Sequence, residues 1–175
     1  MEKIVLLYHT TDGHTVEICE AIKKEIDPAK NEITIVSLLE QPNFDITPFD
    51  KVVIGASIRY GYHDKCVFKF IKKNHVLLDQ KKNAFFSVNV VARKPEKNTA
   101  ETNPYLQKFL SKITWKPKLL DVFAGKIEYP KYGFFDRFMI QLIMKMTKGP
   151  TDKTQTYEFT DWNRVKIFGK KINDL

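Results

Sequence analysis

The stretch LYHTTDGHTVEI, residues Leu7–Ile18, joins an apolar run to a helical pattern through a turn rich in hydroxyl side chains. The apolar run extends from Lys3 to Tyr8, and its continuous hydrophobic character is typical of a buried strand. From Thr15 to Ile26 the apolar residues recur at helical spacing. This order of strand, glycine-containing turn and helix predicts the first βα unit of a parallel sheet.

The same alternation of short β-branched runs and longer helical patterns continues to the end of the chain. Further strands are predicted at Glu32–Leu38, Asp50–Ser57, Asn83–Asn89 and Leu119–Gly125. Further helices are predicted at Lys65–His75, Pro104–Ile113 and Asp161–Ile172. The pattern predicts an α/β fold of the flavodoxin-like type, a three-layer sandwich around a five-stranded parallel sheet of order 2-1-3-4-5.

Length and charge narrow the class of protein. The 175 residues suit a single domain, residues 1–175, with its own core. The net charge of +8 indicates an anionic partner, which could be nucleic acid, an anionic membrane surface or an acidic small molecule. We expect no nucleic acid, because the chain has no helix-turn-helix spacing, zinc knuckle or RNP-like aromatic motif.

The placement of the cysteines and the lengths of the apolar runs indicate the cellular compartment of the chain. Cys19 and Cys66 are far apart and form no CxxC pair, so neither a disulfide framework nor a zinc site is implied, and we expect no metal. Met1–Lys3 lead straight into a strand without the layout of a signal peptide. No apolar run approaches the roughly 20 residues of a membrane-spanning helix. These features predict a cytoplasmic chain.

The turn His9–Thr15 has the composition of a phosphate site. In a doubly wound sheet, ligands bind beyond the carboxyl ends of the strands, where a strand turns into its helix. The turn offers threonine hydroxyls, Gly13 allows close backbone approach, and the helix beyond presents free N–H groups and the positive end of its dipole. The GxxxxGKS/T and GxGxxG motifs are absent. An ordinary N-capped turn is the alternative.

Two further loops are expected to meet this turn at the same sheet edge. GASIRYGYH, Gly55–His63, follows the third strand, and SVNVVARKPEKNT, Ser87–Thr99, follows the fourth. Loops carrying Tyr60 and Asn89 beside a phosphate cradle would hold a flat redox ring, and flavin mononucleotide (FMN) has one phosphate, one such ring and no adenylate. The predicted FMN-binding residues are Thr10, Thr11, Asp12, Gly13, His14, Thr15, Ser57, Ile58, Arg59, Tyr60, Gly61, Ser87, Val88, Asn89 and Val90.

Longer motifs carry a more specific resemblance. These are VVIGASIRYG at 52–61, FFSVNVVARKPEKNTAETN at 85–103 and YPKYGFFDRFMIQLIMKMTKGPTD at 129–152. They resemble the menaquinone-dependent protoporphyrinogen dehydrogenase family of bacterial haem synthesis, a long-chain branch of the flavodoxin superfamily, and the likeness extends to TDW at 160–162. The resemblance implies FMN-dependent oxidation of protoporphyrinogen IX, with electrons passed to a membrane quinone. His9 stands where flavodoxin-type loops commonly begin with serine.

Four cationic side chains lie on the loops around the predicted ring. Because arginine suits bidentate pairing with carboxylates, we expect them to bind the propionates of the porphyrinogen, and a solvated basic rim is the alternative. No dedicated side-chain base is expected, because the flavin itself can accept hydride. His63 is expected to begin its helix, with a proton relay as the alternative. The predicted substrate-binding residues are Arg59, Arg93, Lys94 and Lys97.

The segment 126–153 is a long insertion after or within the fifth strand, and its central part predicts an amphipathic helix over Gly133–Lys148. Arg137, Gln141 and Lys145 form one polar stripe, while phenylalanines, methionines and branched aliphatics cover the rest. We expect an interfacial helix on anionic lipid that brings the flavin to the quinone, and packing into the core or a dimer interface is the alternative. The predicted membrane- and quinone-facing residues are Phe134, Phe135, Arg137, Phe138, Ile140 and Lys145.

Three other functions compete with this interpretation. A flavodoxin-type electron carrier would leave the basic charge and the insertion unexplained. A NAD(P)H:quinone reductase would need a second dinucleotide site, which no motif provides. A membrane-docked binding module would require that the three loops hold no flavin. The preferred interpretation predicts a peripheral protein on the cytoplasmic side of the inner membrane, and the sequence leaves the oligomeric state open.

Overall fold

The computed structural model describes residues 1–175, and its main sheet has the predicted order of parallel strands. The order across the sheet is β2-β1-β3-β5-β6. These strands are β1 (Glu2–His9), β2 (Asn31–Ser37), β3 (Lys51–Arg59), β5 (Lys82–Val88) and β6 (Leu119–Phe123). The sequence patterns missed three short strands: β4 (Tyr62–His63) pairs antiparallel with β3, and β7 (Lys126–Glu128) pairs with β8 (Thr156–Glu158).

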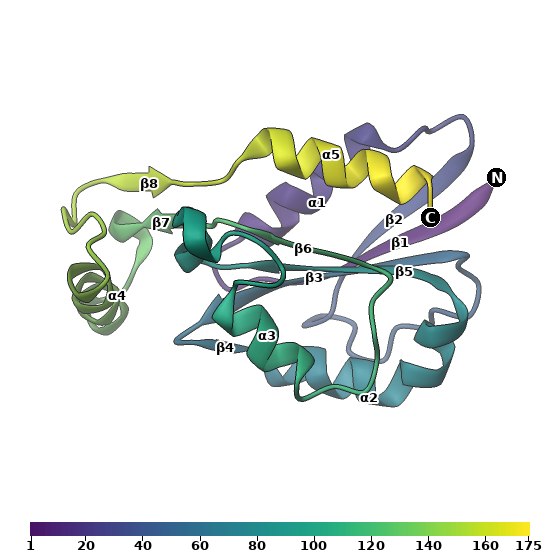
Figure 1. Ribbon diagram of the computed structural model, residues 1–175, viewed down its shortest axis with the longest axis horizontal. Helices are drawn as coiled ribbons and strands as arrows, with labels where there is room; N and C mark the ends of the chain where they lie inside the picture. The colour runs from purple at the N-terminus through teal and green to yellow at the C-terminus, as the bar shows by residue number, and fades with distance from the viewer.

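Helices cover both faces of the sheet (Figure 1). On one face lie α1 (His14–Glu25) and α5 (Trp162–Asn173), and on the other lie α2 (Lys65–Gln80) and α3 (Pro104–Leu110). The helix α2 is longer than predicted because the amphipathic pattern continues to the fully buried Leu78. Short 3-10 turns follow β5 at Val90–Arg93 and Pro95–Lys97, and another follows β7 at Tyr129–Lys131.

The strand β1 explains why its apolar run is continuous. Val5 and Leu7 belong to the core beneath α2 and α3, whereas Ile4 and Leu6 belong to the core beneath α1 and α5. All four side chains are fully buried, because successive residues of a strand point to opposite faces and both faces are covered.

The insertion lies between β6 and α5 and projects beyond the carboxyl edge of the sheet (Figure 1). Residues 126–153 of this segment contain β7 and the helix α4 (Phe134–Met146), and β8, which follows them, pairs with β7. A small separate core of Ile127, Tyr129, Tyr132 and Met144 joins these parts. None of the helices combines the length and the apolar character that crossing a bilayer requires.

Candidate functional site

A cavity of about 440 Å³ opens where the three predicted loops meet the insertion. This volume lies within the range of small-molecule and cofactor sites, about 300–1,000 Å³. The loops after β1, β3 and β5 supply one side, and α4 with the start of β7 supplies the other. The predicted FMN-binding residues that line the cavity are Thr10, Thr11, Asp12, His14, Thr15, Ser57, Ile58, Arg59, Tyr60, Gly61, Val88, Asn89 and Val90.

One end of the cavity has the chemistry of an anion site. Gly13 is the N-cap of α1 with φ of 87°, a left-handed conformation that glycine adopts readily, and it offers no side chain to cap the helix. The hydroxyl of Thr10 accepts hydrogen bonds from the N–H groups of Gly13, at 2.9 Å, and Thr15, at 3.4 Å. Thr15 and Ser57 line the cavity, and their hydroxyls are buried without any hydrogen-bond partner.

His14 anchors the start of α1 with its side chain. Its Nδ1 lies 2.8 Å from the Glu17 carboxylate and its Nε2 lies 2.6 Å from the hydroxyl of Thr160. The Thr160 hydroxyl in turn donates to the backbone carbonyl of Ala124. The His14 side chain therefore ties the turn at Gly13 to the segment that leads into α5.

The β3–β4 turn presents Tyr60 to the cavity. Tyr60 and Gly61 both have positive φ, 50° and 83°, and form the two-residue loop of a tight hairpin. Tyrosine is rarely found in the left-handed region, and such strain is concentrated at functional sites. The Tyr60 hydroxyl donates to the carboxylate of Asp136 at the start of α4. This bond links the hairpin to the insertion across the cavity mouth.

Arg59 lies at the centre of a polar cluster beside this turn. Its guanidinium pairs with Asp12 at 2.7 Å and lies 5.4 Å from the ring centroid of Tyr132. Burial raises the pKa of Asp12, although the Arg59 charge opposes the shift. Burial also raises the pKa of Tyr132 to about 12. Arg59 therefore has a partner within the protein, and an incoming carboxylate would share or replace Asp12.

A buried polar network holds the loop after β5. The side-chain amides of Asn89 and Asn103 exchange hydrogen bonds of 3.3 and 3.2 Å. Ser87 lies behind this pair and contacts His63 Nε2 at 3.0 Å. Burial, with a smaller contribution from His9, lowers the pKa of His63 to about 3, so the ring is neutral at physiological pH. His63 lies in β4 and not in a helix, and it does not line the cavity.

The helix α4 differs from the expected interfacial helix in the direction of its polar stripe. Arg137 donates to the carbonyls of Tyr129, at 3.2 Å, and Tyr132, at 3.0 Å. Gln141 donates to the carbonyl of Thr151 at 2.9 Å. The expectation that Arg137 faces lipid therefore needs correction, because the irregular segments around α4 leave carbonyls that these side chains satisfy. Lys145, which ends the stripe, is exposed.

A second face of α4 forms a wall of the cavity, a position that the sequence pattern did not predict. Ile140, predicted to face the membrane or the quinone, lies on this wall and also packs on the small core of the insertion. The only signal in the sequence was the unusual breadth of the apolar surface of this helix, which implied more than one covered face. The lining residues that sequence reasoning missed are Val91, Tyr105, Gly125, Lys126, Ile127, Tyr132, Met139, Ile143 and Met144.

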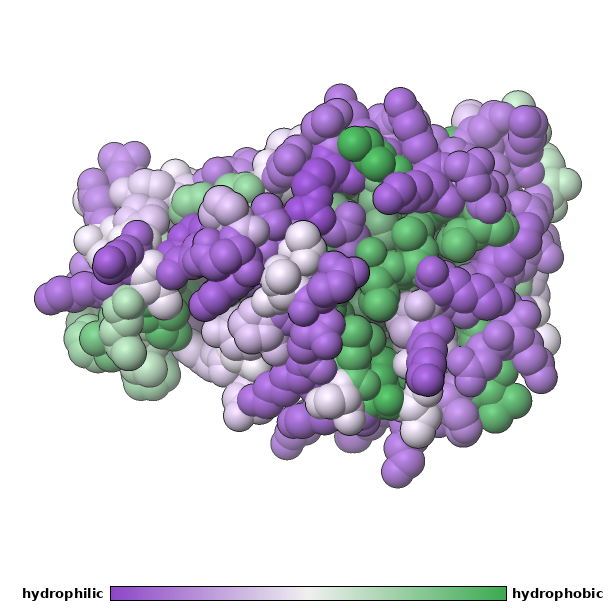
Figure 2. All heavy atoms as spheres, in the orientation of Figure 1, coloured by the Kyte–Doolittle hydropathy of each residue, from purple (hydrophilic) through white to green (hydrophobic).

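The third face of α4 is an exposed apolar ridge, which we define as Phe134, Phe135, Phe138, Leu142 and Met146. Phe134 is 90% exposed and Met146 is 76% exposed. In Figure 2, apolar atoms gather at the end of the molecule where Figure 1 shows α4. Folded monomers seldom leave such contiguous apolar surface uncovered, so the ridge indicates an interaction face.

The remaining predicted residues lie outside the cavity lining. Gly13 and Ser87 contribute through the backbone turn and the network described above. Arg93 donates to the carbonyl of Thr147 at 3.0 Å and to its hydroxyl at 3.1 Å, and thereby holds the end of α4. Lys94 and Lys97 are half-buried and do not line the cavity. Of the four predicted substrate cations, the structure brings only Arg59 into the cavity.

Comparisons with known proteins agree with this geometry. A family profile described as a flavodoxin domain matches residues 5–154. A protoporphyrinogen IX dehydrogenase (quinone) of Leishmania major is 44% identical over 174 residues, which cover 99% of this chain and 75% of that protein. The Escherichia coli (strain K12) protein of the same name is 42% identical over 175 residues, covering 99% and 96%. Oxidised flavodoxin 1 of Bacillus cereus superposes with a TM-score of 0.58 at 16% identity, covering 98% of this chain and 97% of that one.

Proposed function

The chain belongs to the flavodoxin family, and on that premise we propose that it is an FMN-dependent protoporphyrinogen IX dehydrogenase. It oxidises protoporphyrinogen IX to protoporphyrin IX in haem synthesis and passes the electrons to a membrane quinone, with menaquinone as the proposed acceptor. Residues 1–175 act as one flavodoxin-like domain in which 126–153 is an insertion. The similarity to two proteins of this name, which covers 99% of this chain and 75% and 96% of theirs, supports the proposal.

The observation that carries the cofactor assignment is the pair of unpartnered hydroxyls on Thr15 and Ser57. A buried polar group without a partner costs about 1–3 kcal/mol, so folded proteins seldom retain one unless a ligand or water satisfies it. A phosphate at the N-terminus of α1 would accept from both hydroxyls and from the first-turn N–H groups. The residues present therefore fit the phosphate of FMN.

The rest of the cavity fits a flat ring. Tyr60 on one loop and Asn89 on another bracket the space, and apolar side chains of α4 close the side opposite the sheet. FMN bound there supplies the redox chemistry, and the six-electron change from porphyrinogen to porphyrin requires three two-electron oxidations. The chain itself orients the ring, excludes water with the α4 wall and leaves the mouth at the Tyr60 hairpin for the second reactant.

The substrate is a large apolar macrocycle with carboxylate arms, and the cavity mouth has matching chemistry. Arg59 and Lys126 are the two cations that line the cavity, and Arg59, which pairs with Asp12, is the proposed partner of a propionate. Lys94 and Lys97 on the neighbouring loop are further proposed propionate partners. Arg93 is engaged with Thr147, so its proposed contribution is to hold the loop against α4.

The exposed ridge of α4 is the proposed membrane face. Burial of the ridge in an interfacial layer would cover its apolar area, and the exposed Lys145 and Lys148 would meet lipid phosphates. The helix would then lie on the cytoplasmic face of the inner membrane as a peripheral anchor. This orientation brings the cavity wall on the same helix close to a lipid-soluble quinone.

Reconstitution with FMN tests the function. The loaded protein, mixed anaerobically with protoporphyrinogen IX, is expected to lose its flavin absorbance while porphyrin absorbance appears, and added menaquinone should restore the flavin band. Bleaching by NADH but not by porphyrinogen would identify a nicotinamide-driven reductase instead. Tight FMN binding without bleaching by either donor would identify an electron carrier, and failure to bind FMN would refute the proposal altogether.

A further inference from the structure

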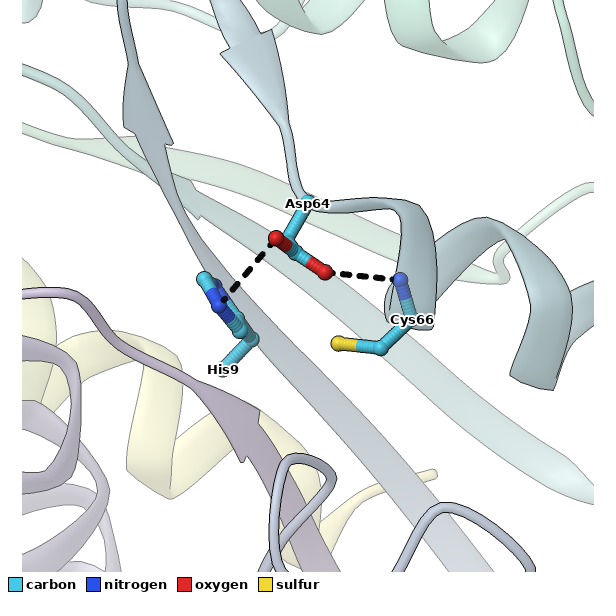
Figure 3. Close-up of side chains that lie close together, drawn as sticks. All are labelled: His9, Asp64 and Cys66. Carbon is cyan, nitrogen blue, oxygen red and sulfur yellow. Dashed lines mark hydrogen bonds and ion pairs between the residues drawn. The ribbon is translucent and has the colours of Figure 1, made fainter.

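Three side chains of metal-ligating type lie together outside the cavity (Figure 3). His9 is the last residue of β1, Asp64 is the N-cap of α2, and Cys66 lies in the first turn of α2. One ligand atom from each lies within 4.8 Å of the other two. None of the three lines the proposed FMN cavity, and nothing in the proposed reaction uses them.

His9 offers its Nε2 to this space, because Nε2 is the ring nitrogen that faces Asp64 and no hydrogen bond within the protein engages it. The residue is only 7% exposed, and its Nδ1 is buried without a hydrogen-bond partner. Its Nε2 lies 3.9 Å from the Asp64 carboxylate, which is too long for a hydrogen bond. A buried imidazole that donates to no protein group and accepts from none is unusual, because buried polar groups are almost always paired.

The other two side chains are already arranged around the same space. Asp64 Oδ1 accepts the backbone N–H of Cys66 at 2.8 Å, which fixes the carboxylate and leaves Oδ2 toward His9. The sulfur of Cys66 points back toward the histidine (Figure 3). The helix cap thus orients two of the three ligands before any ion arrives.

We propose that His9, Asp64 and Cys66 bind one divalent transition-metal ion of the Zn²⁺ class, with solvent as the fourth ligand. A nitrogen, an oxygen and a sulfur donor suit Zn²⁺, which commonly takes three protein ligands and one water. In a tetrahedral site the nitrogen and oxygen ligands lie about 3.4 Å apart, so His9 and Asp64 need to close by roughly half an ångström. The thiol proton passes to solvent as the bond to sulfur forms, and no electrons are exchanged.

The ion would have a defined structural consequence. It would tie the end of β1 to the start of α2, immediately before Thr10, whose hydroxyl organises the turn at Gly13. The partly exposed Asp64 carboxylate provides the path of entry. The spacing of the two cysteines in the sequence gave no indication of such a site, because the fold alone brings His9 to the α2 N-terminus.

Titration of the full-length, FMN-loaded and chelator-treated protein with Zn²⁺ tests the proposal. We expect one equivalent to bind with a Kd below about 1 µM and to protect Cys66 from alkylation. The alkylation reports on Cys66 because Cys19 is completely buried. Cys66→Ser and Asp64→Asn should each weaken binding at least about tenfold, and asparagine preserves the helix cap.

The matched control is His75→Gln, which removes an exposed histidine of α2 and should leave both Zn²⁺ affinity and protection unchanged. Circular dichroism and retained FMN confirm that each variant is folded, and Asp64→Asn decides the outcome if Cys66→Ser does not fold. Absence of stoichiometric binding overturns the proposal. Parent-like binding by Asp64→Asn and Cys66→Ser, or loss of binding in His75→Gln, shows an adventitious surface ion and overturns it equally.

Discussion

Replacing Thr15 with valine should raise the free energy of unfolding of the FMN-free protein and, at the same time, weaken its binding of FMN. Thr15 is fully buried at the start of α1, and its hydroxyl has no partner within the protein. In the protein without FMN, valine fills nearly the same volume and removes an unsatisfied polar group. In the complex, the same change removes a proposed donor to the phosphate.

The sizes of the two effects follow from this environment. Removal of a buried hydroxyl that lacks a partner should raise the free energy of unfolding of the FMN-free protein by about 1 kcal/mol, the lower end of the penalty for such groups. Loss of a hydrogen bond to a charged oxygen should weaken FMN binding by about 1.5–3 kcal/mol, or roughly ten- to 150-fold in Kd.

Urea unfolding of the FMN-free protein and flavin fluorescence titration measure the two quantities. Thr160→Val is the matched control for stability, since the Thr160 hydroxyl is bonded to Ala124 and His14. The same chemical change there should lower the free energy of unfolding, because it leaves those two groups without partners. Lower stability of Thr15→Val, or an FMN affinity equal to that of the parent, would refute the assignment of the phosphate end.

Three further predictions concern other parts of the molecule. Burial lowers the pKa of His63 from 6.5 to about 3. Between these two pH values the imidazole binds a proton in the unfolded chain but not in the folded protein, so the free energy of unfolding should fall as the pH drops below about 6.5. This loss should reach about 2 kcal/mol at pH 5, and pH-dependent unfolding of His63→Gln should be flatter than that of the parent or of His75→Gln. Gly55→Ala would place a Cβ 2.1 Å from the Phe86 ring and should cost about 3 kcal/mol in thermal unfolding, whereas Gly133→Ala, with open space around it, should be nearly neutral. Phe138→Glu on the exposed ridge should abolish sedimentation with anionic vesicles at low salt while FMN stays bound. The control Val76→Glu, at an exposed position of α2, should sediment with the vesicles as the parent protein does. Equal sedimentation of the two variants would exclude the ridge as the lipid face.

The parallel sheet could be predicted because its signals are local. The run Lys3–Tyr8 is continuously apolar, and the structure buries it on both faces, so the pattern and the fold have the same cause. The phosphate-binding turn could be predicted equally well, because Gly13 and the threonines lie within a few residues of one another in the sequence. By contrast, β4 has two residues and exists only because Tyr60 and Gly61 adopt a tight turn. No periodicity can appear in so short a strand.

The orientation of α4 could not be predicted from its own residues. Periodicity correctly grouped Arg137 with Gln141 on one stripe, but it carries no information about what lies opposite that stripe. The carbonyls that Arg137 and Gln141 satisfy belong to the irregular segments Tyr129–Tyr132 and Pro150–Thr151, whose positions depend on tertiary packing. The stripe on an apolar helix predicted contact with lipid phosphates, but in the fold Arg137 and Gln141 donate to backbone carbonyls of the protein.

The three faces of α4 together connect the proposed membrane contact to the cavity. The anchored stripe of Arg137 and Gln141 fixes the rotation of the helix, and this rotation places Met139 and Ile143 in the cavity wall while Phe138 and Leu142 remain outside. The bond between Tyr60 and Asp136 adds a link from the helix to the β3–β4 hairpin at the cavity mouth. A surface that covers the ridge therefore acts on the same rigid helix that shapes the cavity. Displacement of α4 by a partner would move the wall and the mouth together, since one element of 13 residues carries both.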